Sequence, residues 1–248
     1  MTATQQTSAA KQTDPYLKAF ERFEQAGASA QPSWLFPLRK AGIARFAELG
    51  FPTLNHEDWR FTNVAPIAKL PFKPVFEATP DQLTKTSLKQ FPFAGLPGAR
   101  LVFVNGLYSG ELSTVPAQKD GIKVRNLAAA LVSDSLLIEK HLGRYVRTEG
   151  NAFAALNNAF FADGGFVHVP AGKSLDEPVQ FLFINTSKDA GATTHPRNLI
   201  IVAFASRSTM MRLRGCVVAP ASLLVLMKRN CTGSIIDWPA GTKTNPPS

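Results

Sequence analysis

The sequence predicts an α+β fold in which a helical N-terminal region leads into a stack of short strands. Apolar residues recur at helical spacing over residues 14–49 and again over 151–161. Apolar runs of four to six residues then follow at intervals of roughly 13 to 18 residues, separated by turn-forming clusters. This spacing favours stacked sheets or a β-solenoid, in which each rung of strands rests on its neighbour.

The composition is that of a globular protein rather than a disordered or membrane-spanning one. Of 248 residues, 45% are apolar and 18% are charged. No apolar run approaches the ~20 residues that a membrane helix needs, so we expect no membrane partner. Residues 1–13 lack the apolar centre of a secretory signal, which predicts a flexible N-terminus and a cytoplasmic protein.

The net charge of +9 raises the possibility of nucleic-acid binding, but its distribution argues against this function. Residues 204–248 hold six Lys or Arg and a single acid, Asp237, and so carry +5 of that charge. The rest of the chain has an ordinary balance of charges and shows no nucleic-acid-binding motif. We therefore expect no nucleic-acid partner.

Residues 14–150 are expected to form a helical and mixed N-terminal domain. Asp14 and Pro15 are typical of a helix start, and Gly27 is placed to end that first helix. A second helix is predicted from Trp34 to Leu49, with Gly50 after it. The residues expected on the inner faces of the two helices are Leu17, Phe20, Phe23, Leu38, Ile43, Phe46 and Leu49.

The segment from Asn55 to Ile67 combines acids with aromatic side chains and is open to two interpretations. It could be a charged, aromatic binding surface. The favoured alternative is a chain reversal in which Trp59 and Phe61 pin a loop to the core while the charged neighbours stay in water. Prolines punctuate residues 71–98, which are therefore expected to form connecting structure.

The next stretch contains a hairpin and then a strand and a helix. Leu101 to Val104 is predicted to be a buried strand, and the Asn105-Gly106 pair after it is a strong signal for a tight hairpin turn. Residues 121–143 predict a short strand followed by one helix that Gly143 terminates. His141 near the end of that helix suits the helix dipole and needs no catalytic role.

Residues 151–203 are expected to begin the strand-rich core. The helix that opens this region should bury Phe153, Leu156, Phe160 and Phe161, with Asn157 and Asn158 just off its inner face. Strands are predicted at residues 166–169, 179–184 and 199–202. The middle strand is apolar on both faces and should therefore be covered on both sides.

No group of residues has the spacing of a catalytic or metal site. His56 stands beside Glu57 and Asp58, but three adjacent residues cannot all point at one ion. Cys216 and Cys231 lack the further ligands of a zinc site. The strand region offers Asp163, Asp176 and Glu177 among its acids, and its histidines are His168 and His195. A carbohydrate-active enzyme on a β-solenoid, which needs clustered acids, remains only an alternative.

Four blocks of sequence carry a resemblance to a known family. They are Asn55–Thr62 (NHEDWRFT), Val102–Ser113 (VFVNGLYSGELS), Phe153–Gly164 (FAALNNAFFADG) and His195–Leu199 (HPRNL). In this order they resemble the SufB/SufD family, the scaffold subunits of the SUF iron–sulfur cluster assembly machinery. The resemblance spans about residues 14–203, and the first block favours the SufD branch.

The resemblance implies a helical N-terminal domain followed by a right-handed β-helix, of which residues 151–203 would be the opening rungs. It implies a non-catalytic scaffold that pairs with SufB through the β-helix and binds the ATPase SufC through a C-terminal region. An iron–sulfur cluster, and a flavin, are associated with the complex of the family. No cofactor is expected on this chain alone, and the resemblance assigns no catalytic, cofactor-binding or metal-binding residue here.

Residues 204–248 depart from the family pattern. They contain both cysteines and three of the four methionines in addition to the basic excess. We expect this change of composition to mark a frameshift in the gene, which would leave the β-helix truncated and its function impaired. A genuine lineage-specific tail is the alternative.

Overall fold

The computed structural model describes residues 14–25, 31–77, 83–89, 95–187, 189 and 191–203, together with the backbone of 223–228. The predictions for residues 1–13, for Gly27 and for both cysteines lie outside the described residues, as does most of the tail. Within the part that is described, no helix is long and apolar enough to cross a membrane.

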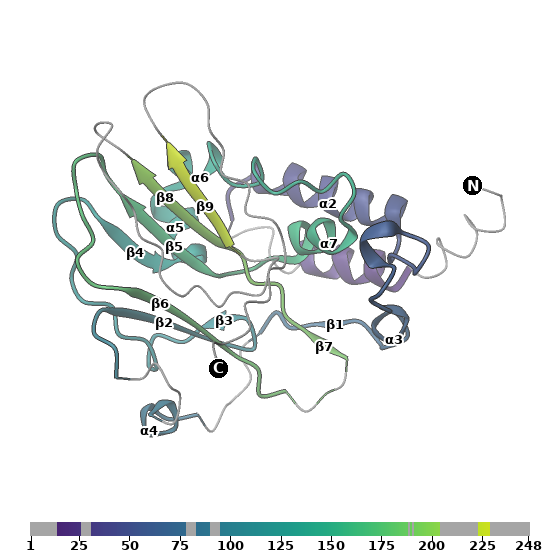
Figure 1. Ribbon diagram of the computed structural model, residues 1–248, viewed down its shortest axis with the longest axis horizontal. Helices are drawn as coiled ribbons and strands as arrows, with labels where there is room; N and C mark the ends of the chain where they lie inside the picture. Colours follow the sequence, from purple (N-terminus) through teal and green to yellow (C-terminus); the bar gives the residue numbers. More distant parts are fainter. Residues whose placement is uncertain are drawn as a thin grey trace, which may run out of the picture.

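Three helices form one end of the molecule. Residues 14–25 are helical, and they lie near α2 (Leu35–Leu49) and α7 (Ala152–Phe160), which run side by side (Figure 1). A Cβ on Gly42 would lie 2.8 Å from the Ala155 carbonyl oxygen, so a glycine is needed where α2 crosses α7. The buried residues of this cluster are Tyr16, Phe20, Phe23, Ile43, Phe46, Phe51, Val64, Ala152, Ala155, Leu156, Ala159 and Phe160.

The helix α2 confirms the predicted second helix almost to the residue. Gly50 follows it with a φ of 62°, a conformation that a residue with a Cβ rarely adopts. Its N–H donates to the Phe46 carbonyl at 2.8 Å and so satisfies one of the last helical carbonyl groups.

The helix α7 is buried on nearly all sides, which the amphipathic pattern did not predict. Its N-cap is Asn151, whose side-chain oxygen accepts from the Ala154 N–H at 2.9 Å. Asn157 and Asn158 are buried rather than set off to one side. The Asn157 amide donates to the Pro196 carbonyl at 3.0 Å, which ties the helix to the segment before residues 198–203. Phe161 lies just beyond α7, in extended backbone.

Short elements link the helices to the sheets. They are η1 (Glu57–Trp59), α3 (Ala65–Ala68), β1 (Lys73–Pro74) and α4 (Lys85–Leu88). The last two fall within residues 71–98, so the expectation of no regular element there is wrong at these two places. Thr84 caps α4 through a reciprocal pair of hydrogen bonds with Ser87, which stabilises one isolated turn of helix.

The predicted hairpin is confirmed. Strand β2 (Ala99–Val104) pairs antiparallel with β3 (Leu107–Tyr108) across Asn105 and Gly106. These two residues have φ values of 50° and 85°, as a tight hairpin turn with two left-handed residues requires.

Four successive strands belong in turn to three sheets, and the fourth strand lies in the same sheet as the first. They are β5 (Gly165–Val169), β6 (Val179–Ile184), β7 (Ala192–Thr193) and β8 (Asn198–Ala203). Strand β8 lies parallel to β5, with Ile200 opposite Val167. Likewise β6 pairs parallel with β2, and β7 pairs parallel with β1. From β5 to β8 the chain therefore completes one circuit around the three sheets. Along this circuit it adds β6 beside β2, β7 beside β1 and β8 beside β5, each in the parallel direction.

Two further strands complete the largest of the three sheets. Strand β4 (Lys123–Asn126) pairs antiparallel with β5, and β9 (Leu223–Lys228) pairs parallel with β8. The sheet order is β4-β5-β8-β9, next to β3-β2-β6 and β1-β7. The architecture is thus a mixed one, in which N-terminal helices pack against a set of largely parallel strands (Figure 1).

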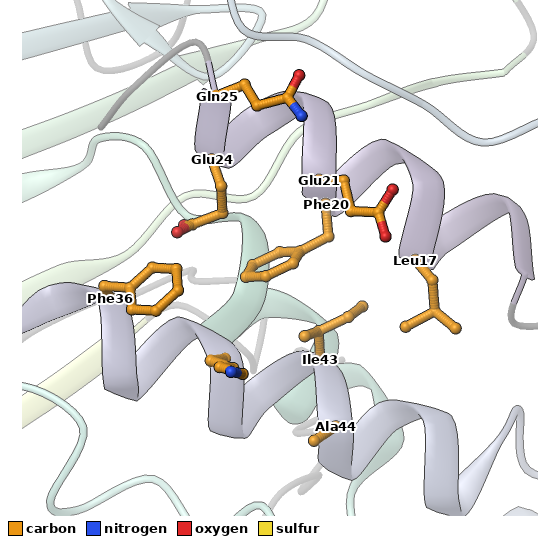
Figure 2. A pocket seen from close by; sticks show the side chains of 9 residues that line it. Leu17, Phe20, Glu21, Glu24, Gln25, Phe36, Ile43 and Ala44 are labelled. Carbon is orange, nitrogen blue, oxygen red and sulfur yellow. The ribbon is translucent and has the colours of Figure 1, made fainter. Parts of the chain in front are cut away.

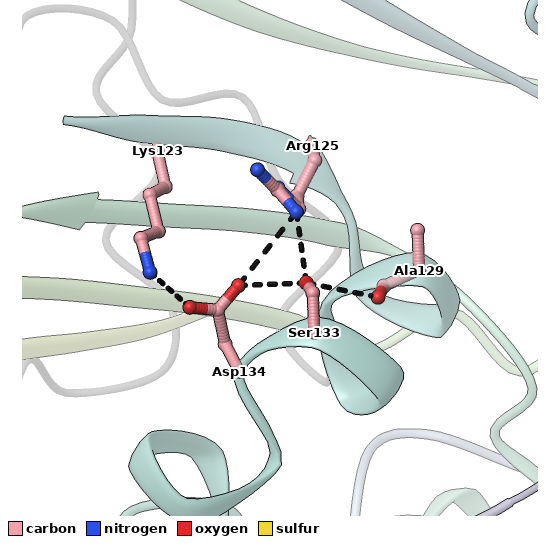
Figure 3. A network of polar contacts seen from close by, with 5 residues as sticks. All are labelled: Lys123, Arg125, Ala129, Ser133 and Asp134. Carbon is pink, nitrogen blue, oxygen red and sulfur yellow. Dashed lines mark hydrogen bonds and ion pairs between the residues drawn. The ribbon is translucent and has the colours of Figure 1, made fainter. Parts of the chain in front are cut away.

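The single helix predicted after β4 is two helices. They are α5 (Leu127–Ser133) and α6 (Ser135–Glu139), and Asp134 between them has a non-helical φ of −128°. The break occurs because the Asp134 side chain turns back to β4 (Figure 3). Its carboxylate accepts hydrogen bonds from Lys123 and, at 2.8 Å, from Ser133.

The Asp134 carboxylate is the centre of a charged network. Its side chain is only 5% exposed, and the Arg125 guanidinium lies 3.7 Å from it. Burial raises the pKa of the carboxyl, but the hydrogen bonds from Lys123 and Ser133 and the nearby positive charges outweigh burial, so the pKa lies below its ordinary value. The network ties β4 to the helices that cover it.

A second buried carboxylate stands where α7 passes into β5. Asp163 accepts from the Ala128 N–H at 2.9 Å and from the Asn126 amide at 2.9 Å. It thereby satisfies a free N–H in the first turn of α5. Burial raises the pKa of Asp163, while these hydrogen bonds and one from the Gly164 N–H oppose that rise.

The turn at Gly164 brings two distant segments into direct backbone contact. The Arg197 N–H donates to the Asp163 carbonyl at 3.0 Å, and the Gly165 N–H donates to the Asn198 side chain at 2.6 Å. A Cβ on Gly164 would lie 1.9 Å from the Arg197 carbonyl oxygen. We call the contact of residues 163–165 with 197–198 the junction.

We expect Gly164→Ala to destabilise the protein by at least about 3 kcal/mol, because the added methyl group cannot fit without moving backbone at the junction. Urea denaturation followed by tryptophan fluorescence measures the change. Gly150→Ala is the matched control, since nothing lies within 4 Å of its added Cβ. A change within about 0.5 kcal/mol at both positions would contradict the proposed close approach.

We expect Asp134→Asn to lower the free energy of unfolding by about 1–3 kcal/mol at neutral pH, because it removes the charge that Lys123 and Arg125 face. The pKa of Asp134 is lower in the folded than in the unfolded protein. Its contribution to the free energy of unfolding is therefore complete above the unfolded-state pKa near 3.9, and it is lost as the pH falls through the lower folded-state pKa. Denaturation midpoints of wild type and variant should therefore converge below about pH 4. Glu177→Gln, at an exposed site, serves as control, and a pH-independent difference would refute the electrostatic cause.

Candidate functional site

The strand β6 presents an open edge. In the described part of the chain it has β2 on one side and no strand on the other. All six of its residues are partly exposed, so the prediction of a strand covered on both sides is confirmed only in part, by side chains that pack on apolar clusters on either face. Such an edge offers unpaired backbone N–H and C=O groups to a further strand.

The side chains of β6 divide between two apolar clusters. Val179, Phe181 and Phe183 pack on the cluster that contains Leu101 and Phe103. The Phe103 and Phe183 rings stack with their centroids 4.7 Å apart.

On the opposite face of β6, Leu182 and Ile184 pack on the cluster of Leu88, Val102 and Leu112. Because both faces of β6 are apolar and its edge is open, a partner strand placed beside it would continue both clusters.

The Asn105 side chain holds the segment that follows β6. The Asn105 side-chain oxygen accepts from the Thr186 N–H at 2.9 Å and from the Ser187 N–H at 3.2 Å. Its amide donates to the Thr186 hydroxyl at 3.0 Å. The Asn-Gly pair thus does more than turn a hairpin, because it also holds the chain that leaves β6.

Two buried guanidinium groups flank one aromatic ring next to the junction. The Arg39 and Arg197 guanidinium carbons lie 5.1 Å and 5.5 Å from the centre of the Phe161 ring. Arg39 also donates to the Phe161 carbonyl at 2.8 Å. Burial lowers the pKa of each guanidinium to about 10. Sequence reasoning did not find this pair, because charged residues are ordinarily expected on the surface.

The acids considered for a carbohydrate-active enzyme do not share a site. Asp163 is buried at the junction, whereas Asp176 and Glu177 are exposed in the turn before β6. A pair of carboxyl groups flanking a substrate bond is the minimum for that chemistry. The geometry therefore gives no support to a glycosidase.

The two histidines of the strand region also stand apart. His168 lies on β5 opposite Lys123 of β4, and burial together with the charge of Lys123 lowers its pKa. His195 packs against the Phe72 and Phe160 rings, which also contact each other, and burial lowers its pKa to about 4. An uncharged, ring-packed imidazole in this position has a packing role.

Among the described residues, no group of three or more His, Cys, Asp or Glu side chains could hold a metal ion. The His56 ring bonds to Thr53 instead, whose N–H lies 3.0 Å from its Nδ1 atom.

The structure corrects the prediction that both aromatic residues of the Asn55–Thr62 block anchor a loop. Trp59 does so, with its ring 5.3 Å from that of Phe153. Phe61, in the turn after η1, is 92% exposed. Part of the block is therefore available as a surface, as the less favoured interpretation held.

Comparison with known proteins places this chain among relatives of one family. The family described as SufBD protein N-terminal region matches residues 10–181 of the chain. An iron–sulfur cluster assembly SufBD family protein of Synechocystis sp. is 25% identical over 206 residues, which cover 82% of this chain and 44% of the relative.

Two further relatives carry the same family description. The chloroplastic protein ABCI8 of Arabidopsis thaliana is 26% identical, with 75% of this chain and 35% of the relative covered. A protein of Staphylococcus aureus strain USA300 is also 26% identical, with 69% and 38% covered. The chain thus spans less than half the length of these relatives. Since the family match covers more than half of the chain, the protein belongs to the SufBD family.

Proposed function

We propose that this chain is a SufD-like, non-catalytic scaffold component in iron–sulfur cluster assembly in the cytoplasm, and that the frameshift predicted for residues 204–248 leaves the contact at β6 intact. The observation that carries the proposal is the family match together with the open, apolar edge of β6. The relatives are named for iron–sulfur cluster assembly. The exposed block around Arg60 and Phe61 is the sequence feature that favours SufD over SufB.

We further propose that the circuit from β5 to β8 is the first coil of a right-handed β-helix. Gly165 of β5 contacts Asn198 of β8, 33 positions along the chain, and the two strands run parallel. Parallel strands joined by a crossover in one sheet are almost always connected with a right-handed sense. The pairing of β8 with β9 supports the addition of a further strand in the same direction.

The proposed partner at the open edge is SufB. Strand addition supplies backbone hydrogen bonds, and the alternating apolar faces of β6 supply the side-chain contacts. The proposed partnership with the ATPase SufC rests on family resemblance. The iron–sulfur cluster is the cargo of the complex, and we assign neither it nor a flavin to any residue of this chain.

Co-expression with SufB and SufC tests this function, with affinity purification of this chain and hydrogen exchange of the recovered complex. We expect SufB to co-purify and to slow amide exchange across residues 179–184 by at least tenfold, because a free edge becomes paired. Strand β2 is the internal control, since it already has a neighbour on each side and should change little.

Two outcomes would contradict the proposal. In one, neither SufB nor SufC is recovered with the chain. In the other, SufB is recovered but β6 exchanges at the rate measured for the chain by itself, which would place the contact elsewhere.

A further inference from the structure

An apolar groove runs between the helix of residues 14–25 and α2. Its cavity volume is about 470 Å³, within the range of ligand pockets. Figure 2 shows Phe20 and Ile43 facing each other across it, with Leu17 and Phe36 at its ends. A groove lined by such side chains takes an apolar group.

The rim of this groove is charged on both sides. Glu21 and Glu24 project from the first helix (Figure 2), and Lys40 lines the groove from α2. Glu21 and Lys40 form no ion pair with another described residue, whereas Glu24 lies close enough to the buried Arg39 guanidinium for each charge to affect the pKa of the other. An occupant with a cation on one side and an acid on the other would therefore find Glu21 and Lys40 available as partners of opposite charge.

The same chain displays a group with these properties. Phe61 projects into solvent, and the Arg60 guanidinium carbon lies 5.6 Å from the centre of its ring. Glu57 and Asp58 precede them on η1, and all three charged residues are exposed. None of the three is ion-paired with another described residue either. We call residues 57–61 the knob.

We propose that the knob of one copy docks into the helix groove of a second copy. Phe61 fills the apolar floor, Arg60 faces Glu21 and Glu24, and the acids of the knob face Lys40. Aromatic and arginine side chains are the commonest anchors of protein interfaces, and a desolvated pocket is where they contribute most. The contact joins two different surfaces, so it is heterologous and leaves one knob and one groove free in each pair.

This contact is separate from the strand edge of the proposed function. It uses the helical end of the molecule, whereas β6 belongs to the sheets (Figure 1). Loss of one contact therefore leaves the other intact, and the two proposals can fail independently.

Sedimentation velocity of the full chain from about 1 to about 200 µM at low salt tests the proposal. We expect the weight-average sedimentation coefficient to rise with concentration. Phe61→Ala should weaken the association at least tenfold, and Arg60→Glu should do the same. Leu136→Ala and Arg22→Glu are matched controls, because Leu136 is 78% exposed, Arg22 is exposed and neither lines the groove.

A charge exchange provides the sharper test. The variant Arg60→Glu has a reversed knob, and the double variant Glu21→Lys/Glu24→Lys has a reversed groove. Each should be monomeric by itself, while an equimolar mixture should associate, because every knob then finds a groove of opposite charge.

The proposal is overturned if the wild-type chain is monomeric throughout the concentration range. It is equally overturned if association persists unchanged in Phe61→Ala, or if the mixture of the two charge variants behaves as the sum of its components. Persistence in Phe61→Ala would assign the association to another surface, such as the strand edge.

Discussion

The contact between the Asp163–Gly164 turn and the Arg197–Asn198 segment is the constraint on which the rest of the structure depends. It closes the circuit from β5 to β8, and it stands directly after α7, which packs on α2. The absence of a side chain at Gly164 lets the Arg197 backbone approach. The Asp163 carboxylate then satisfies N–H groups at the start of α5 and at Gly164. Helices and sheets are thus joined at this place by backbone and side-chain hydrogen bonds, in addition to the apolar packing of Leu35 with Phe166 and Leu199.

Features of local origin were predictable from the sequence. The Asn105-Gly106 turn, the end of α2 at Gly50 and the strands after Gly164 depend on residues a few positions apart. Left-handed backbone favours glycine or asparagine, a helix often ends at glycine, and strands show runs or alternation of apolar residues. These signals can be read from neighbouring residues, which explains why the predictions agree with the structure.

Features that depend on distant partners were not predictable. The break at Asp134 reflects its attraction to Lys123 on another element, and the burial of Arg197 reflects the ring of Phe161. Phe61 is exposed although Trp59, two residues before it, packs on Phe153. The open edge of β6 could be anticipated only in part, since an apolar pattern shows that a strand is covered but not which side lacks a neighbour.

The unequal sequence separations of the parallel pairs bear on how the fold forms. Asn105 meets Thr186 across 81 positions, whereas Gly165 meets Asn198 across 33. The entropy of loop closure differs between such loops by only about 1 kcal/mol, so both pairings are thermodynamically accessible. Their kinetics differ more, because folding slows as contacts become more distant in sequence. The pairing of β5 with β8 is therefore expected to form before β2 reaches β6, so that the edge strand β6 gains its neighbour last.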